Sequence, residues 1–347
     1  MRLFGKIGIS ILLLFITFSC EEEVIQSIPV EQEFPFEISA ADYSSSHFFL
    51  DTIYRHIFED FHKEYPPYIT SEMVANEINE VEVWILTHNI FEHGRRLAKT
   101  YFDLPSKQKR NSLYDSSSFT NLDTSIGKYE IGYFRRLEPG NEYRVQERTG
   151  ILSFMIPLYQ ELAIAVSYST LDNQYFGEFS GIDTNAIRPI ILKLIKPINI
   201  NPYYKLAWDL MLKNIYKLDS SFSTLHEEDF DLEITFRTQN RVKDTLFMGG
   251  HLLRVVGFDN FADTGGATPD HRFDFLPMFT INKKYGEIIF PTLRPFDTGI
   301  KNYFVQNNPS VSVPDSLLFN ALYDSMRTDA RRSPKNRFFI KWRIQNH

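Results

Sequence analysis

The amino-acid sequence predicts a mainly β fold, a β-sandwich or jelly-roll-like region with a few peripheral helices. Short segments with a period of two, rich in β-branched and aromatic residues, recur along most of the chain. Gly and Pro separate these segments, and few stretches have the 3.6-residue period of an amphipathic helix. Hydrophobic residues make up 43% of the 347 residues, so the chain can build a packed core and global disorder is excluded.

The first 20 residues have the pattern of a bacterial lipoprotein signal. Arg2 and Lys6 precede an apolar segment at 7–16 that is too short to span a bilayer comfortably. Small Ser19 comes just before Cys20, which favours cleavage at that bond, although the usual Leu three residues before the cysteine is Thr. We therefore expect residues 1–19 to be a signal peptide and Cys20 to carry the lipid. The alternative is an ordinary signal peptide with an incidental cysteine.

Cys20 is the only cysteine of the chain, so no disulfide can form within it. Glu21, Glu22 and Glu23 follow directly. An acidic run at this place resembles the signal that sends lipoproteins of gliding bacteria to the cell surface. We expect lipid anchoring in the outer membrane with display at the cell surface. The alternative is a solvated tether on a protein that faces the periplasm.

Two helices are predicted between a tether and the strands. Residues 20–50 carry acids, serines and isolated prolines without a sustained period, which predicts an acidic tether. Asp51 can cap a helix that runs to about Tyr65, where Pro66-Pro67 ends it. A second short helix is expected over Ser71–Asn79, so that residues 51–80 form a region of short helices.

Residues 81–347 form the predicted β-rich region, with a possible internal boundary near 180–187. Strands are expected at 81–86, 128–135, 143–154 with a break at Thr149-Gly150, 162–168, 188–196, 230–237, 252–258, 280–282 and 287–293. The segment Lys205–Leu218 fits a helix or a buried strand equally well. Asp315–Arg331 has the apolar spacing of a helix that starts after Pro314.

Motifs for chemistry are weak in this sequence. His88 and His93 flank Glu92, but five-residue spacing separates the two imidazoles around a helix, and zinc proteases need other spacings. Glu138, Glu142 and Glu147 could be imagined as a carboxylate pair for glycoside hydrolysis, but alternating acids usually mark a solvated strand face. Neither Gly-x-Ser-x-Gly nor a Gly-rich phosphate loop occurs. We expect no enzyme activity and no cofactor.

One loop offers a weak calcium candidate. Asp259, Asp263, Asp270 and Asp274 surround Gly265-Gly266, and calcium prefers several oxygen ligands on a tight loop. The register of an EF-hand fails, however, and Asp and Gly are common in any long turn. The expectation is therefore no metal, with this loop as the candidate to examine.

Several runs, taken in order, resemble the SprA (Sov) family of outer-membrane translocons. The runs are Ile69–Val74, Ile78–Trp84, Leu137–Tyr143 before Gly150, Ala163–Tyr168, Gly177–Phe179, Trp208–Tyr216, Leu253–Val255, Asp270, Phe273–Phe275, Gly286–Phe296 and Leu322–Ser325. Each run is a weak match by itself. Their order and spacing over residues 66–341, about four-fifths of the chain, are fairly specific.

The resemblance implies a part of the type IX secretion and gliding-motility machinery. Members of this family form a very large β-barrel that conducts folded cargo, and they work with a PorV-type shuttle and plug proteins. The family offers no catalytic residues. Such translocons are many times longer and lack a lipid anchor, so we expect a truncated, split or detached module of the translocon.

The alternative is that the protein is a surface-exposed lipoprotein that binds glycans or matrix. The predicted anchor and the many aromatic residues favour this alternative. A third, metal-dependent hydrolysis centred on His88, Glu92 and His93, has the least support. The net charge of −7 argues against a nucleic-acid partner, because such a surface repels phosphates. The expected partners are the outer membrane and other components of type IX secretion.

Replacing Cys20 by Ser is expected to abolish lipid attachment, because the acyl groups are carried by the cysteine thiol. Metabolic labelling with an alkyne fatty acid should mark the natural protein and leave the variant unlabelled and released from the membrane fraction. A variant with Glu21, Glu22 and Glu23 replaced by Gln should keep the label and lose exposure to protease added outside the cell. Unchanged labelling of Cys20→Ser would contradict the prediction.

Overall fold

The computed structural model describes residues 34–114, 128–182, 188–218, 226–238, 240, 242–261 and 268–345. The signal peptide, Cys20 and Glu21–Glu23 lie outside these residues. Residues 34–347 belong to one compact unit, and all of the following concerns that unit. Its described helices include none that is long and apolar enough to cross a membrane.

The predicted mainly β fold is confirmed, with several sheets and few helices. The strands are β1 Phe36–Ser39, β2 His47–Phe49, β3 Ile78–Leu86, β4 Arg96–Tyr101, β5 Tyr129–Arg136, β6 Tyr143–Gln146, β7 Ile151–Phe154, β8 Ile164–Thr170, β9 Tyr175–Phe176, β10 Ile190–Lys196, β11 Ile215–Lys217, β12 Phe230–Arg237, β13 Lys243–Asp244, β14 Leu246–Phe247, β15 Gly250–His251, β16 Ile281–Asn282, β17 Glu287–Ile289 and β18 Phe338–Ile344. The α-helices are α1 Ile53–Phe61, α2 Ser71–Ala75, α3 Lys205–Leu210, α4 Leu252–Val255, α5 Ile300–Asn307, α6 Ala321–Asp324 and α7 Arg327–Arg332.

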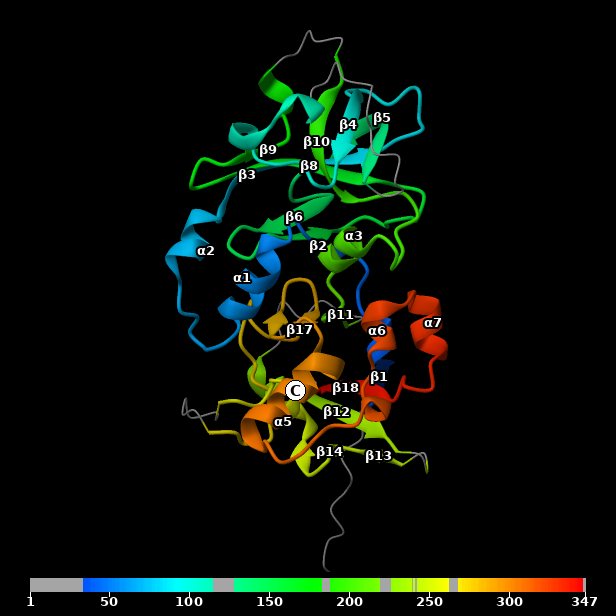
Figure 1. Cartoon of the computed structure of the whole chain (residues 1–347). Coiled ribbons are helices and arrows are strands. Elements are labelled where there is room, and N and C mark those ends of the chain that lie inside the picture. The colour runs from blue at the N-terminus through cyan, green and yellow to red at the C-terminus, as the bar shows by residue number, and fades with distance from the viewer. Residues whose placement is uncertain are drawn as a thin grey trace, which may run out of the picture. The chain divides into compact units, whose positions relative to one another are not determined.

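Within the described residues, five strands close into a small barrel. The order is β10-β4-β5-β3-β8, and β10 also pairs with β8 to complete the circle (Figure 1). Closure removes the free edges that an open sheet would expose. Every residue of β8 and β10 is buried, including Ser167, Ser169, Lys193 and Lys196, so neither strand shows the alternation of a half-buried strand.

A second sheet has the order β1-β18-β12-β13 and lies below the barrel in Figure 1. β12 and β18 pair antiparallel along their whole length, from Phe230 opposite Ile344 to Phe236 opposite Phe338. Helix α4 packs against β12. Smaller sheets are formed by β2-β7-β6, by β11-β17-β16 and by β14-β15.

Two hydrophobic cores follow from this arrangement. The barrel core gathers side chains from β2, α1, β3, β8 and β10, with Trp84 and Phe134 almost completely buried. The C-terminal core is rich in phenylalanine, and the ring of Phe338 lies 4.9 Å from Phe236 and 5.0 Å from Phe296, measured between centroids. Aromatic pairs at this spacing stabilise a core beyond the area that they bury.

The segment Lys205–Leu218, for which the sequence allowed either a helix or a strand, contains one of each. Lys205–Leu210 form α3, and Ile215–Lys217 form β11, which pairs with β17. Trp208 on α3 belongs to the barrel core, whereas Tyr216 on β11 belongs to the C-terminal core. Because the buried side chains of this segment change from one core to the other within a few residues, its apolar residues follow neither the helical nor the strand period throughout.

The predicted tether ends earlier than residue 50. β1 pairs with β18, β2 pairs with β7, and Phe48, Phe49 and Leu50 are buried in the barrel core. Sequence reasoning missed these strands because they are only three or four residues long and have partners more than 100 residues away. The predicted boundary near 180–187 is followed by β10, which lies in the same barrel as β4 and β8.

Several predicted elements have different bounds or types. The first helix ends at Phe61, before Pro66, and the second ends at Ala75 because the chain enters β3 at Ile78. The predicted strand at 252–258 is helix α4, whose face toward β12 buries Leu252, Leu253 and Val255. Val255, Val256 and Phe258 favour a strand locally, but the tertiary contact decides otherwise.

The predicted helix Asp315–Arg331 is broken into a 3-10 turn, α6 and α7, with extended backbone at Leu318 and Ser325. The breaks follow contacts to a neighbouring segment. The Phe319 amide donates to the Phe296 carbonyl, the Phe296 amide donates to the Tyr323 hydroxyl, and Arg294 pairs with Asp324. A continuous helix could not make all of these contacts.

Gly150 offers a test of how tightly α1 is packed on the β6–β7 connection. Its φ is +61°, and a Cβ atom there would lie 2.3 Å from the Tyr54 ring. Gly150→Ala should lower the free energy of unfolding by roughly 3 kcal/mol or more, from the left-handed backbone and from overpacking together.

Gly140→Ala is the matched control, since its φ is +81° and nothing lies within 4 Å of the added methyl. It should cost about 1 kcal/mol for the backbone alone. Chemical denaturation of both variants measures the difference. Equal losses would show that Tyr54 does not press on Gly150.

Candidate binding cleft beside the barrel

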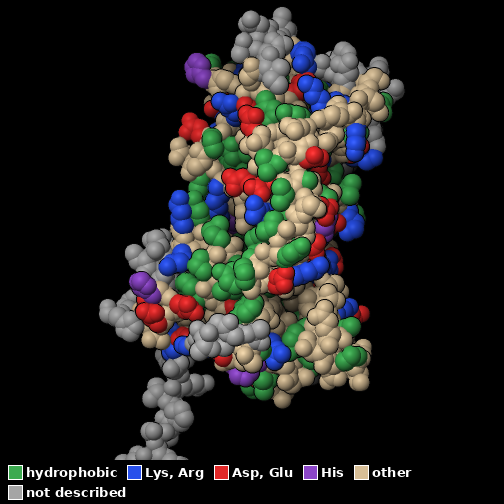
Figure 2. Space-filling model, turned by 90° about the vertical axis from the view of Figure 1, so that its left-hand side faces the viewer, with side chains coloured by type: hydrophobic (Ala, Val, Ile, Leu, Met, Phe, Trp, Pro, Cys, Tyr) green, Lys and Arg blue, Asp and Glu red, His purple; other side chains and the backbone are tan. Residues whose placement is uncertain are grey.

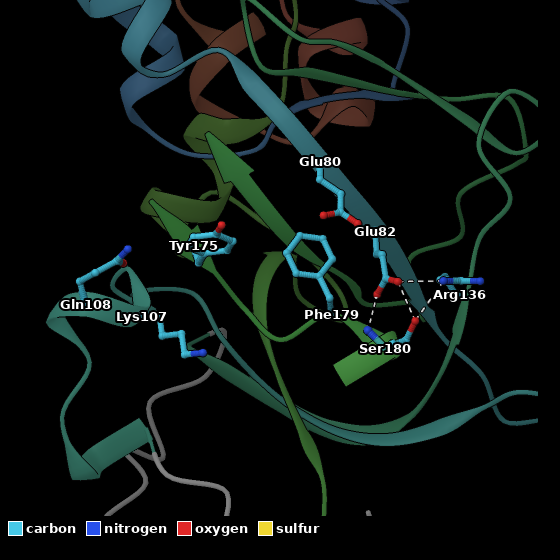
Figure 3. A pocket seen from close by; sticks show the side chains of 9 residues that line it. Glu80, Glu82, Lys107, Gln108, Arg136, Tyr175, Phe179 and Ser180 are labelled. Carbon is cyan, nitrogen blue, oxygen red and sulfur yellow. Dashed lines mark hydrogen bonds and ion pairs between the residues drawn. The ribbon is translucent and has the colours of Figure 1, made fainter. Parts of the chain in front are cut away.

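An open cleft of about 670 Å³ lies beside β3 of the barrel. β3 contributes Glu80 and Glu82, the end of β5 contributes Arg136, and the segment after β8 contributes Tyr175, Phe179 and Ser180 (Figure 3). Lys107 and Gln108 border the other side. A second hollow of about 540 Å³ shares Glu80, Glu82, Arg136 and Ser180 and continues towards Leu137–Pro139.

The Glu82 carboxylate holds the wall of the cleft together. One oxygen accepts from the Arg136 guanidinium at 2.8 Å and from the Ser180 hydroxyl at 2.6 Å, and the other accepts from the Ser180 amide at 2.9 Å (Figure 3). Charge-assisted bonds of this kind are the strong ones. All of these groups therefore serve to fix the segment around residue 180 to β3.

The position of Phe179 depends on a glycine. Gly177 has a φ of +76°, and a Cβ there would lie 2.8 Å from the Val166 carbonyl of β8. Glu178 then turns into the barrel wall, where its carboxylate accepts from the Ile191 amide of β10 at 2.9 Å. Phe179 and the partly exposed Tyr175 are left at the cleft with their rings turned towards it (Figure 3).

The cleft combines two aromatic rings with charged groups of both signs. Ser180 donates its hydroxyl proton to a carboxylate that is already bound to Arg136, and Glu82 is saturated with donors. This arrangement suits recognition, in which rings supply apolar contact and Lys107, Glu80 and Arg136 supply polar contact at the rim. On the face drawn in Figure 2, basic and acidic side chains are interspersed, with apolar side chains in patches between them.

The residues proposed for calcium have other tasks in the structure. Asp259 accepts the amides of Asp270 and His271, at 2.9 and 3.2 Å. Asp274 accepts the amides of Asn260 and Phe261, and burial raises its pKa to about 6. Asp263 lies outside the described residues, so the weak calcium candidate stays a hypothesis.

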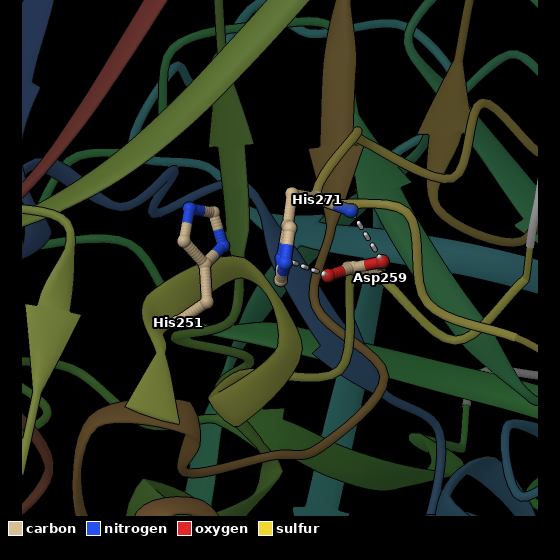
Figure 4. Close-up of side chains that lie close together, drawn as sticks. All are labelled: His251, Asp259 and His271. Carbon is tan, nitrogen blue, oxygen red and sulfur yellow. Dashed lines mark hydrogen bonds and ion pairs between the residues drawn. The ribbon is translucent and has the colours of Figure 1, made fainter. Parts of the chain in front are cut away.

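A different group gathers at this loop: His251, Asp259 and His271 each place one ligand atom within 4.8 Å of the others (Figure 4). Sequence reasoning missed this group. The two histidines are 20 residues apart and neither lies in a recognised ligand spacing, so only the fold of the loop brings them together.

The histidines and glutamates that the sequence offered as weak catalytic candidates do not line the cleft itself. His88 and Glu92 lie in the connection between β3 and β4, and Glu92 accepts from the Asn89 amide side chain at 3.4 Å. His93 borders the second hollow. Glu142 forms a two-bond pair with Arg135, and that hydrogen-bonded arginine lowers the pKa of the Glu142 carboxyl.

The cleft residues themselves were not singled out by the sequence. Glu82, Arg136 and Ser180 are separated by 54 and 44 positions, so no local motif connects them. The signal that could have pointed to them is the alternation in Glu80-Val81-Glu82, which places both carboxylates on one face of β3.

A separate buried charge lies between the two cores at Lys213. Its ammonium is 4.2 Å from the centre of the Trp208 ring, and the side chain is buried. Burial lowers the pKa of Lys213 to about 7, partly offset by Asp209. A cavity of about 20 Å³, the size of one water, lies beside it among Arg55, Trp208 and Arg294.

In comparisons with known proteins, no family model matches the chain, and no curated protein matches it significantly.

Lys213 generates a prediction on stability and pH. Its pKa is about 7 in the folded chain and near 10.4 when unfolded, so between these values the unfolded chain binds more protons. Stability from this group therefore rises with pH from about 7 to about 10, and the full cost of the buried charge is present below pH 7. Lys213→Met should remove this dependence on pH, so the free energy of unfolding of the variant should exceed that of the natural protein most below pH 7 and least above pH 10.

The measurement is the difference between the free energies of unfolding of the two proteins at several pH values, because tyrosines and other lysines titrate in the same range. Lys205→Met is the control, since Lys205 is exposed and pairs only with Asp209 at the surface. A constant difference between Lys213→Met and the natural protein would refute the prediction.

Proposed function

We propose that this protein is a non-catalytic, SprA-like component of type IX secretion and gliding at the outer membrane, held there by the lipid on Cys20. It acts by contact with other envelope proteins, and the cleft beside β3 is a contact site. The expected partners are a SprA-like barrel, a PorV-type shuttle or a plug protein. The observation that carries the proposal is that runs with SprA resemblance meet at this cleft.

Three of these runs contribute to the cleft and its second hollow. Ile78–Trp84 supplies Glu80 and Glu82, Gly177–Phe179 supplies Phe179, and Leu137–Tyr143 borders the second hollow. The runs also bind one another: the Leu137 amide donates to the Val83 carbonyl at 2.8 Å. Ala163–Tyr168, a fourth run, pairs with Ile78–Trp84 along β3 and β8.

The remaining runs contact one another in the C-terminal part. The Trp208 indole donates to the Tyr323 carbonyl at 2.6 Å, and Asn214 exchanges two hydrogen bonds with Phe290, both at 2.9 Å. Arg294 pairs with Asp324. These runs are distant in sequence but bind one another in the structure. Their mutual contacts support the view that the runs belong to one inherited module.

The chemistry of the cleft supports a role in binding. The Ser180 hydroxyl donates to Glu82, and the Glu82 carboxylate accepts three hydrogen bonds. A nucleophile requires a nearby base that is free to take its proton, and Glu82 is already neutralised by Arg136. The exposed rings and the mixed charges at the rim resemble the composition of protein contact surfaces.

Site-specific photo-cross-linking tests the proposal in living cells. A benzoylphenylalanine at Tyr175, in the cleft, is expected to capture a type IX secretion component, which mass spectrometry identifies. The same residue at Tyr203, an aromatic that is 95% exposed and does not line the cleft, is the control and should capture much less. Tyr175→Ala together with Lys107→Ala should reduce secretion of type IX cargo.

The proposal fails if the natural protein co-purifies with no type IX component and if its deletion leaves cargo secretion and gliding unchanged. Capture at Tyr203 equal to that at Tyr175 would leave the function intact but remove the cleft as its contact site.

Binding of glycans is a second candidate, because the partly exposed Tyr175 and Phe179 border an open cleft in which a sugar ring could stack. Affinity electrophoresis in gels that contain envelope polysaccharide separates the two functions. Retardation that disappears in Tyr175→Ala would favour glycan binding, whereas unchanged mobility in every gel would exclude it.

A further inference from the structure

We propose that His251, Asp259 and His271 form a binding site for one divalent transition-metal ion of the zinc type. The three residues come from separate parts of the C-terminal lobe, here the segment 216–345 around the C-terminal core. His251 ends β15 and precedes α4, Asp259 follows α4, and His271 lies in the loop that leads to Phe273. One atom of each lies within 4.8 Å of the others.

The first observation is a buried carboxylate oxygen without a donor. Asp259 is completely buried, and its Oδ1 accepts the amides of Asp270 and His271. No described residue donates a hydrogen bond to its Oδ2, which lies 3.5 Å from Nδ1 of His271. An unsatisfied buried carboxylate oxygen is costly, and a cation at this point would remove the cost.

The second observation concerns His251. Its Nδ1 is buried and has no hydrogen-bond partner among the residues that the structure describes. Figure 4 shows one of its ring nitrogens turned towards His271 and Asp259. The two imidazole rings are 4.7 Å apart between centroids. Two nitrogen atoms and one oxygen atom thus converge on one point, with the acid in the interior and His271 at the surface.

The distances fit a small ion. Ligand atoms at about 2.1 Å from a tetrahedral zinc ion lie about 3.4 Å from one another. The Asp259–His271 separation of 3.5 Å already has this value. The other separations in the group are at most 4.8 Å, so binding requires a side-chain adjustment.

The donor set selects the class of metal. Imidazole nitrogens suit zinc, cobalt, nickel and copper, whereas calcium and magnesium prefer a shell of oxygens. The two amides on Oδ1 orient the Asp259 carboxylate, as second-shell donors do in metal proteins. A three-ligand site leaves one tetrahedral position for water or for a side chain of a partner.

The metal would tie the loop 257–274 to the start of α4. Both ends of this loop are already anchored, since the Phe258 amide donates to Leu253 and the Asp274 amide donates to Phe258, each at 2.8 Å. The part that carries His271 is exposed. Binding would therefore add a third anchor at the surface and stabilise the folded chain by mass action.

The test uses the lipidated protein in detergent, stripped of metal and titrated with zinc alone by calorimetry. We expect one equivalent to bind and the midpoint of thermal unfolding to rise. Cobalt alone should give the visible absorption of a four-coordinate ion. His271→Asn should weaken zinc binding by more than about 100-fold, because even the loss of a second-shell partner costs 10–100-fold.

His271→Asn is chosen because it is expected to fold. His271 is exposed and has a φ of +67°, a left-handed conformation that asparagine tolerates. His251→Gln is the second variant. The controls are His88→Gln with His93→Gln, and His56→Gln, whose imidazole forms a surface pair with Glu72 at 3.2 Å. These controls should bind zinc as the natural protein does.

The proposal is overturned if the natural protein binds no stoichiometric zinc, or if His271→Asn and His251→Gln bind it unchanged. Loss of binding in the His88 and His93 control would assign the metal to that pair. Binding of calcium in place of zinc would assign the loop to the aspartate set.

Discussion

The connection between the two cores depends on Asn214, a completely buried polar residue between α3 and β11. Its side-chain amide donates to the Phe290 carbonyl, and its own carbonyl accepts the Phe290 amide. Since β11 then pairs with β17, this exchange sets the register of both strands. The preceding residues end in the barrel core, and the following ones begin the C-terminal core. Both cores thus depend on this exchange, because leaving the Asn214 side-chain NH2 group or the Phe290 backbone groups unpaired in the interior would be costly.

The same physical constraint operates at the cleft and at the metal cluster. At the cleft the Glu82 carboxylate is satisfied by Arg136 and Ser180, so the charges fix the backbone of the cleft wall. At Asp259 one oxygen is satisfied by backbone amides and the other is not. The first arrangement is complete without a ligand and presents a surface for contact. The Asp259 carboxylate still has one oxygen without a described donor, and for this reason we treat it, and not Glu82, as a candidate ligand for an ion.

Much of the strand pattern was predictable from the sequence, because β3, β5, β8, β10 and β12 are long and rich in β-branched and aromatic residues. The errors have particular causes. The segment 252–258 is rich in residues that favour strands but packs as α4 on β12. The apolar spacing of 315–331 indicates a helix, but its pairs with Arg294 and Phe296 interrupt it. β1 and β2 are too short to leave a periodic signal.

What the sequence by itself determined is the mainly β character. Its local patterns also predict a lipoprotein signal that ends at Cys20 and resemble one family in an ordered series of runs. Local chemistry and periodicity suffice for these features because each lies within one segment. Tertiary structure alone decided the closure of the barrel, the cleft at Glu82 and Ser180, and the meeting of His251 with His271. Each of these joins residues that are tens of positions apart, and the free energy that brings them together comes from burial of the whole chain, which no short window contains.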